Sequence, residues 1–164
     1  MTYHIRVRAG AVIIQNQSIL LVEFTNERGV HYNLPGGGVD PHESIRDTVR
    51  REAMEEACAD VDVGPLAFVY EYAPHLSSYR FGDTHTISFF FESKLKNGSV
   101  PKYPDYPDPY QTGVKWIPLS ELDHIVLFPN IKKQIIEYSL KKRNIVWISE
   151  DELEEAYFKT QPKK

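Results

Sequence analysis

The residues of this chain whose types and spacing are best suited to chemistry are three glutamates, Glu52, Glu55 and Glu56. On an α-helix, residues three and four positions apart are neighbours, so these carboxylates occupy one arc of the surface. Like charges at this spacing destabilise a helix by roughly 0.2–0.5 kcal/mol per pair, and the helix dipole disfavours negative charge in the last turn. A hard divalent cation resolves this conflict, because magnesium is held by carboxylate oxygens and water.

The same residues also fit a simpler interpretation, a solvated charged face with an ordinary ion pair between Arg51 and Glu55. Glu56 argues against it, because the helical wheel places this residue inside the apolar stripe, where a carboxylate needs a partner. Three consecutive glycines at 36–38 precede the helix. We expect them to form a tight loop with backbone angles closed to other residues, which brings carbonyls and amides near a metal ion or a phosphate.

Hydrophobic patterning predicts the elements that position these residues. Pro41 to Ala57 has helical periodicity, and Pro101 to Pro109 contains four prolines, which exclude a helix interior and a central strand. The segment 25–29 is a polar loop. Strands are predicted at 5–14, 19–24, 61–72, 85–92 and 114–118, with an edge strand at 145–148, and further helices at 130–142 and 150–158.

Composition limits the class of protein. The 164 residues, 41% hydrophobic and 26% charged, predict a single domain over residues 1–164. The net charge of -4 argues against a general nucleic-acid-binding surface. No apolar stretch approaches the roughly 20 residues that cross a bilayer, so no membrane partner is expected. The N-terminus lacks the pattern of a secretory signal, and Cys58 as the single cysteine excludes an intrachain disulfide, which together predict a cytoplasmic protein.

One longer pattern resembles a known family. Gly37, five residues, Glu43, seven residues and then the segment 51–56 (Arg-Glu-Ala-Met-Glu-Glu) resemble the Nudix box, the 23-residue loop–helix–loop signature of the MutT-like Nudix hydrolases. The lead-in at 34–36 and the segment 116–122 are also similar to family sequences. The resemblance implies an α+β fold, the α/β/α Nudix sandwich, with a mixed central sheet between helices.

The end of the box departs from the family pattern. Cys58 stands where the family usually has glycine, and Ala59 where it has a larger apolar residue. A cysteine in a left-handed helix cap adds strain of order 1 kcal/mol, or else the helix ends differently. We expect Cys58 to be a small buried residue that fills space rather than a functional thiol.

The resemblance implies a role for each box residue. Glu52, Glu55 and Glu56, with the carbonyl of Gly37, would hold Mg²⁺, or Mn²⁺ as a substitute. Glu52, Glu55 and Arg51 form the implied catalytic set, in which Arg51 orients a glutamate. Glu43 is either a helix-start carboxylate or an outer ligand of the metal.

The implied function is hydrolysis of a phosphoanhydride (pyrophosphate) bond in a nucleoside diphosphate linked to another moiety. Candidate substrates, which are the expected small-molecule partners, are nucleotide sugars, ADP-ribose, dinucleoside polyphosphates and nucleoside triphosphates. The alternative is a non-catalytic Nudix domain that binds a nucleotide-type metabolite as a sensor. Such domains often lose box carboxylates, which this chain keeps.

The general base and the substrate-binding residues stay open. In the family the base comes either from the box, where Glu52 is the leading candidate, or from a loop outside it. The loop candidates are Asp83, Asp105 and Asp108, and for each of them a solvated turn former is the favoured interpretation.

Aromatic residues and one proline give weaker clues to the substrate. The tyrosines at 103, 106 and 110 either stack on a nucleobase or pack the proline-rich loop, and packing is favoured. Pro74 has a spacing reminiscent of Nudix enzymes that act on ADP-ribose, although it can also simply end a strand. Trp116 and Phe128 are expected in the core.

The tail from 144 to 164 is a C-terminal extension of the predicted domain. Its apolar residues supply either a homodimer contact or a surface that packs back onto the same domain.

Overall fold

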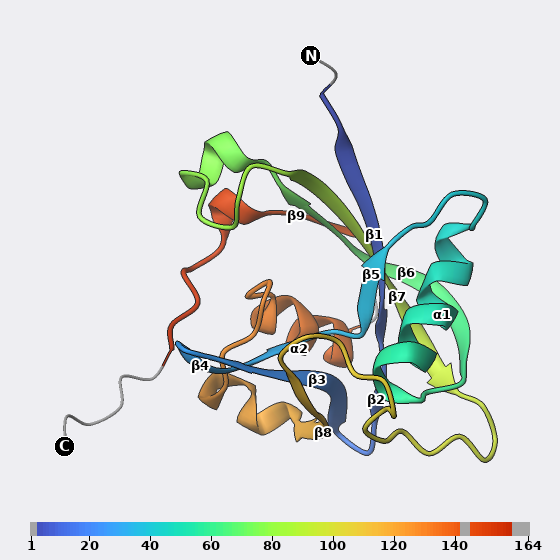
Figure 1. The fold of residues 1–164 in the computed structure, drawn as a ribbon. Helices are drawn as coiled ribbons and strands as arrows, with labels where there is room; N and C mark the ends of the chain where they lie inside the picture. Colours follow the sequence, from blue (N-terminus) through green and yellow to red (C-terminus); the bar gives the residue numbers. More distant parts are fainter. Residues whose placement is uncertain (1–2, 142–144, 159–164) are drawn as a thin grey trace.

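The computed structural model of the chain describes residues 3–141 and 145–158 (Figure 1). Its strands are β1 (Ile5–Val12), β2 (Ile14–Gln15), β3 (Ser18–Asn26), β4 (Gly29–Asn33), β5 (Gly36–Gly38), β6 (Val61–Tyr72), β7 (His85–Leu95), β8 (Gln111–Pro118) and β9 (Val146–Ser149). The α-helices are α1 (Ile45–Ala57) and α2 (Lys132–Leu140), and three short 3-10 helices are η1 (Pro74–Ser77), η2 (Leu119–His124) and η3 (Glu150–Glu152).

The strands form two sheets. The larger one has the order β5-β1-β7-β6-β9, in which β1 runs parallel to β7, β9 runs parallel to β6, and the other pairs are antiparallel. In the smaller sheet, β3 pairs with β2, β4 and β8. The predicted edge strand at 145–148 is thus confirmed as β9, shifted by one residue.

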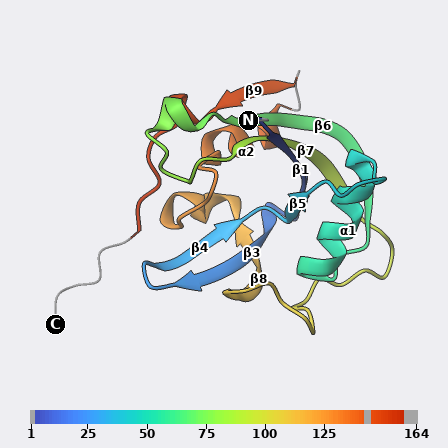
Figure 2. The same cartoon turned by 45° about the horizontal axis from the view of Figure 1, so that its top comes forward.

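A helix covers each face of the larger sheet. Successive side chains of a strand point to opposite faces, so β1 contributes residues to two separate cores. Ala9 and Ala11 of β1 pack on the side of Val49 and Ala53 in α1. Val12 packs in a second core with residues from α2 and the segment before it. Figure 2 shows α1 and α2 on opposite sides of β1 and β7. The predicted α/β/α sandwich with a mixed sheet is confirmed.

The helix that carries the glutamates begins later than its periodicity predicted. Ser44 caps α1 by accepting a hydrogen bond from the backbone amide of Asp47 at 3.1 Å, so residues 41–43 form a turn before it. At the other end, Cys58 takes the left-handed conformation with φ of 49°, and its amide donates to the carbonyls of Ala53 and Met54. The helix therefore ends as a glycine-capped helix does. Cys58 is half-buried, not fully buried as expected.

The glycines at 36–38 are not a loop of unusual backbone angles, so that prediction was wrong. They form β5, and the described glycines with positive φ are Gly29, Gly82 and Gly98. Glycine is needed at 36 and 37 for close approach. A Cβ on Gly36 would lie 2.6 Å from the carbonyl oxygen of Ala9, and one on Gly37 would collide with the carboxylate of Glu52.

Two further predictions need correction. The expected loop at 25–29 is mostly strand, because β3 and β4 form a hairpin in which Asn26 pairs with Gly29. The expected helix at 150–158 is limited to η3, and the chain beyond it has no regular structure. Its residues are held by side-chain contacts instead, such as Leu153 against the α2-side core. The predicted tail residues 144 and 159–164 lie outside the described part of the chain.

Candidate active site

The carboxylate of Glu56 is the most deeply placed of the helix acids. It lies on the buried face of α1, as the helical wheel predicted, and 4% of the residue is exposed. Its Oε1 accepts a hydrogen bond of 2.8 Å from the backbone amide of Gly36 in β5. Burial raises the pKa of Glu56 to about 8, and the charges of Glu52 and Asp108 add to this shift.

Glu52 lies one turn earlier on the same helix and is also withdrawn from water. Its side chain is 13% exposed, and Oε1 accepts a hydrogen bond of 2.8 Å from Nη1 of Arg51. Burial raises the pKa of Glu52, although the Arg51 guanidinium opposes the shift. The carboxylate packs directly against Gly37, which explains why a side chain cannot be accommodated there.

Arg51 lies at the centre of an ion-pair network along the outer side of α1. Its Nε and Nη2 donate to both carboxylate oxygens of Glu43, and Nη2 also donates to the carbonyl of Gly38 at 3.0 Å. These contacts raise the pKa of Arg51, chiefly through its bonds to Glu43, and hold that of Glu43 at about 2. Arg51 therefore joins the loop before the helix to Glu52.

Glu55 is placed differently from the other two helix acids. Its side chain is 58% exposed, and Oε2 accepts a hydrogen bond of 3.2 Å from Nη1 of Arg51, the ion pair expected from the sequence. Glu55 therefore lies at the outer rim of the cluster, where water can reach it.

The arrangement fits a divalent cation. Within residues 3–141 and 145–158, no three His, Cys, Asp or Glu side chains converge as a ready-made ligand cluster. Glu52 and Glu56, however, are two desolvated carboxylates that lie against Gly37 and Gly36, and the charge of Glu52 adds to the raised pKa of Glu56. A cation would remove this conflict, and magnesium commonly binds through one or two carboxylates plus water and substrate phosphates.

Comparison with known proteins assigns this geometry to a family. The sequence model of the NUDIX domain matches residues 4–138, most of the chain and the whole of the box. The chain belongs to the NUDIX family.

Relatives support the same assignment. A Bacillus subtilis (strain 168) protein, provisionally named an 8-oxo-dGTP diphosphatase, is 29% identical over 128 residues, which are 77% of this chain and 74% of that protein. The NUDIX hydrolase of Nitrosomonas europaea superposes with a TM-score of 0.67 at 20% identity, covering 90% of this chain and 80% of its own. An ADP-ribose pyrophosphatase of Streptococcus suis 89-1591 superposes with a TM-score of 0.60 at 24% identity, covering 88% and 96%. The prediction of a MutT-like Nudix pyrophosphohydrolase is confirmed at the level of family and reaction class.

A cavity of about 570 Å³ opens beside the Nudix box, and the sequence analysis did not identify it. Gly36 and Gly37 form part of its wall, as do Arg6 and Arg8 of β1. Burial and the charge of Arg6 lower the pKa of Arg8, whereas Glu56 and other acids oppose this. The signal that could have found these arginines is their two-residue spacing on a strand, which puts them on one face.

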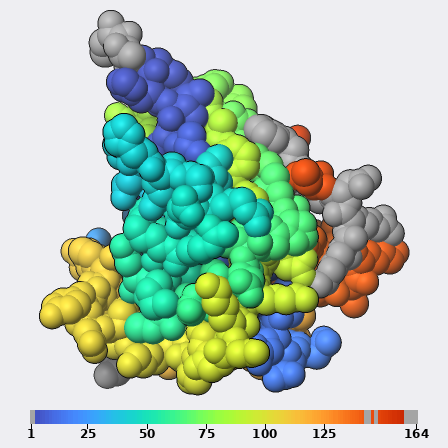
Figure 3. Space-filling model, turned by 90° about the vertical axis from the view of Figure 1, so that its right-hand side faces the viewer, coloured from blue at the N-terminus to red at the C-terminus, as the bar shows by residue number. Residues whose placement is uncertain are grey.

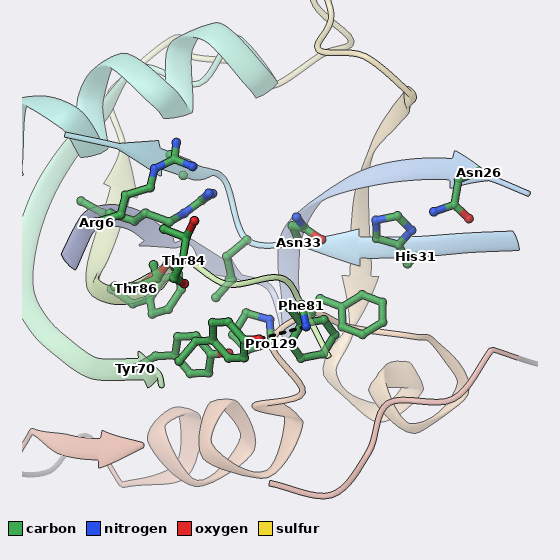
Figure 4. Close-up of a pocket in the computed structure, with 18 of the residues that line it drawn as sticks. Arg6, Asn26, His31, Asn33, Tyr70, Phe81, Thr84, Thr86 and Pro129 are labelled. Atoms are coloured by element: carbon green, nitrogen blue, oxygen red, sulfur yellow. Dashed lines mark hydrogen bonds between the residues drawn. The ribbon is translucent and has the colours of Figure 1, made fainter. Parts of the chain in front are cut away.

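The far end of the cavity is aromatic. Figure 4 places Arg6 and Thr86 at one end, and His31 and Asn26 at the other. The rings of Phe128 and Phe158 lie against His31, and the ring of Phe81 lies against Phe128. Phe128 was expected in the core and instead lines this cavity. Trp116, also expected in the core, is 38% exposed on β8, which is an outer strand of the smaller sheet.

The proline-rich loop docks onto the C-terminal end of α1 (Figure 3). The buried amide of Gln111 donates to the carbonyl of Glu56 at 2.8 Å, and its Oε1 accepts from the backbone amide of Asp108. The Asp108 charge accordingly raises the pKa of both Glu52 and Glu56. Asp108 is thus the loop candidate that the fold ties to the end of the Nudix helix, through Gln111. The other two loop candidates, Asp83 and Asp105, lie at exposed positions.

The three loop tyrosines do not behave alike. Tyr103 donates a hydrogen bond to the carbonyl of Gln111 and is part of the loop's own packing, as favoured from the sequence. Tyr106 and Tyr110 are 93% and 73% exposed, so packing does not account for them. Pro74 is buried and starts η1 directly after β6, which fits its simpler interpretation as a residue that ends a strand.

Proposed function

We propose that this protein is a magnesium-dependent Nudix hydrolase that cleaves the phosphoanhydride bond of a nucleoside diphosphate linked to another group. The observation that supports this most strongly is the pair of desolvated carboxylates, Glu52 and Glu56, which contact Gly37 and Gly36, two glycines that line a cavity. Mn²⁺ is expected to substitute for Mg²⁺.

The box residues divide into ligands and positioning residues. Glu52 and Glu56 would hold the metal, with Glu55 acting from the rim and the Gly37 carbonyl adding an oxygen. The chemistry supplied by a bound magnesium ion is neutralisation of phosphate oxygens and activation of a water. Arg51 keeps Glu52 in place and stays ionised through Glu43, so neither of these two residues needs to touch the substrate.

Arg6 and Arg8 are placed to bind the diphosphate. Both line the cavity beside β5, and Arg8 is a desolvated cation. A guanidinium presents several donors in a planar fork that matches phosphate oxygens. These two arginines would orient the anionic part of the substrate against the box carboxylates.

We assign proton abstraction from the attacking water to Asp108 rather than to Glu52. Glu52 is already engaged by Arg51, and its carboxylate is needed as a ligand. Asp108 is exposed, lies in a loop fixed by Gln111, and acts electrostatically on both buried carboxylates. An exposed carboxylate at the edge of the site can accept a proton and release it to bulk water.

A cleavage screen with magnesium or manganese, in which chromatography measures the nucleotide products, tests the proposal. The panel contains ADP-ribose, a nucleotide sugar, a dinucleoside polyphosphate, a nucleoside triphosphate and its 8-oxo form. We expect metal-dependent cleavage of at least one member, abolished by EDTA. Binding of a panel member without cleavage of any would contradict hydrolysis and favour a metabolite-sensing Nudix domain.

We also propose a compartment, a domain organisation and an oligomeric state for the protein. In the described part of the chain, no helix is long and apolar enough to cross a membrane. The cytoplasm remains our proposed compartment, because a chain with a single cysteine forms no intrachain disulfide of the kind typical of oxidising compartments. We keep one domain as the organisation of the chain, because β9 of the extension pairs with β6. A homodimer remains a prediction, although the described tail residues Ile148 and Leu153 pack on their own core.

A further inference from the structure

The C-terminal extension lies beyond the residues that match the NUDIX domain, yet it reaches the cavity at two places. The first contact is made by Glu150, which is buried and accepts a hydrogen bond of 2.9 Å from the hydroxyl of Tyr70. Tyr70 lines the cavity near Arg8. The parallel pairing of β9 with β6 sets this contact, because it brings Ser149 opposite Glu71.

The second contact is made by Phe158, the last described residue. Its ring lies 5.8 Å from that of Phe128 and 6.1 Å from that of His31, measured between centroids. It also covers the turn between β3 and β4, where a Cβ on Gly29 would lie 3.6 Å from the Phe158 ring. The extension therefore leaves the sheet at β9 and runs back along the molecule to the aromatic end of the cavity (Figure 1).

We propose that the C-terminal extension is a specificity element of the active site, in which Phe158 forms one wall of a pocket for the base of the nucleotide substrate. The proposal rests on the proposed function, since it assigns the base-bearing half of that same substrate. Three described rings lie against His31. Phe24 and Phe128 belong to the family-matched region, and Phe158 comes from the extension.

The chemistry of the two ends fits the two halves of a nucleotide. Arg6 and Arg8 offer positive charge beside the Nudix box, whereas the Phe158 end offers faces for a flat, uncharged ring. His31 and Asn33 line the cavity, and a buried polar atom of each, Nδ1 of His31 and Oδ1 of Asn33, has no hydrogen-bond partner among the described residues. The polar edge of a base supplies the donors and acceptors that such atoms need.

The test compares Phe158→Ala with the matched control Tyr157→Ala in the full chain. Tyr157 is the neighbouring aromatic residue, is 75% exposed and is not among the residues that line the cavity. The probes are AMP, GMP and ribose 5-phosphate, which carries the phosphate without a base, and affinity is measured by calorimetry with magnesium. A base stacked on an aromatic side chain is worth about 1–3 kcal/mol, so we expect Phe158→Ala to weaken AMP or GMP binding by about 5- to 150-fold.

Specific outcomes would overturn the proposal. Ribose 5-phosphate should bind Phe158→Ala and the unaltered chain alike, and Tyr157→Ala should bind all three probes as the unaltered chain does. Equal loss for ribose 5-phosphate, or unchanged binding of both nucleotides, contradicts a base pocket. If Phe158→Ala lowers the midpoint of thermal unfolding, Phe158→Trp becomes the deciding variant, and it must keep nucleotide affinity within about threefold.

This experiment separates the inference from the proposed function. It measures binding of products rather than turnover, so a chain that cleaves nothing still gives a result. Where a substrate is cleaved, Phe158→Ala should raise KM and leave kcat within about twofold, because the ring acts on binding and not on the reacting phosphate.

Discussion

Arg51 holds Glu43 in a two-pronged contact, from Nε to Oε2 at 2.6 Å and from Nη2 to Oε1 at 2.9 Å. Thr48, fully buried on the same helix, donates to Oε1 of Glu43 as well. Nη1 of Arg51 also donates to Glu52. Glu43 therefore fixes the position of Glu52, a proposed metal ligand, through the guanidinium of Arg51. A role as a helix-start residue alone therefore does not explain the contacts of Glu43 with Arg51 and Thr48.

Arg51→Lys tests whether this geometry matters. A lysine keeps the charge but cannot form the planar fork, so Glu52 loses its fixed orientation. Loss of such a supporting contact typically costs 10- to 100-fold in metal affinity or activity, and we expect a fall of about that size in kcat/KM. Arg50→Lys is the control, since Arg50 is exposed and pairs only with Asp47 among the contacts described. Equal effects of the two substitutions would contradict the positioning role.

Glu56→Gln tests the deepest carboxylate. The amide keeps the size of the side chain but removes the negative charge, so metal-dependent turnover should fall by at least about 100-fold while the fold stays intact. Steady-state formation of the nucleotide product measures turnover, and Mn²⁺ titration measures metal affinity. Glu121→Gln, at an exposed position on η2, should leave both unchanged. A Glu56→Gln variant with full activity would remove this residue from the proposed metal site.

The pH dependence of stability follows from the same residue. The pKa of Glu56 rises from an ordinary 4.5 to about 8 in the folded chain, so the folded state keeps a proton that the unfolded state has lost. Without metal, the contribution of Glu56 to the free energy of unfolding is fully present below pH 4.5 and is lost as pH rises towards 8. At about 1.36 kcal/mol per pKa unit, the loss is on the order of a few kcal/mol.

Urea denaturation in EDTA at several pH values between 4.5 and 8 measures this effect. Glu56→Gln should flatten the curve, leaving the smaller slope from Glu52, whose pKa is also raised. Metal affinity should change in the opposite sense and increase with pH, because the cation displaces the proton. Parallel stability curves for the variant and the unaltered chain would show that Glu56 titrates normally.

The part of the site carried by one helix was predictable from sequence. Helical periodicity alone placed Glu56 on the buried face of α1, as found, whereas the exposure of Glu55 was learned from the structure. The start of the helix was missed because Ser44 competes locally as a cap, which an apolar pattern does not register. The left-handed end at Cys58 was one of two expected outcomes, and glycine is absent there without loss of the cap.

The rest of the site depends on contacts between distant segments. Gln111 anchors the loop to Glu56 across 55 residues, and Glu150 meets Tyr70 across 80. No local pattern distinguishes such a glutamine or tyrosine from an ordinary surface residue, so the cavity and the choice among loop acids could not be read from the sequence. The glycines of β5 were singled out for the wrong property, since the close approach of β1 to Gly36 and of Glu52 to Gly37, rather than a turn, excludes a side chain.

Asp108→Asn tests the assignment of the proton acceptor. Because the loop is fixed by Gln111 through backbone and side-chain contacts, an amide at 108 should leave its conformation unchanged and remove the base. General base catalysis typically contributes about 10²- to 10⁴-fold, so kcat should fall within that range while Mn²⁺ affinity changes by less than about tenfold. Removing the charge should also lower the raised pKa of Glu52 and Glu56, which a pH titration of metal binding would detect as a shift of the midpoint to lower pH.

Asp105→Asn, in the same loop, is the control and should keep kcat within about twofold. If Asp108→Asn stays active while Glu52→Gln loses turnover but still binds Mn²⁺, the base lies within the box, and Glu52 takes the role assigned to Asp108.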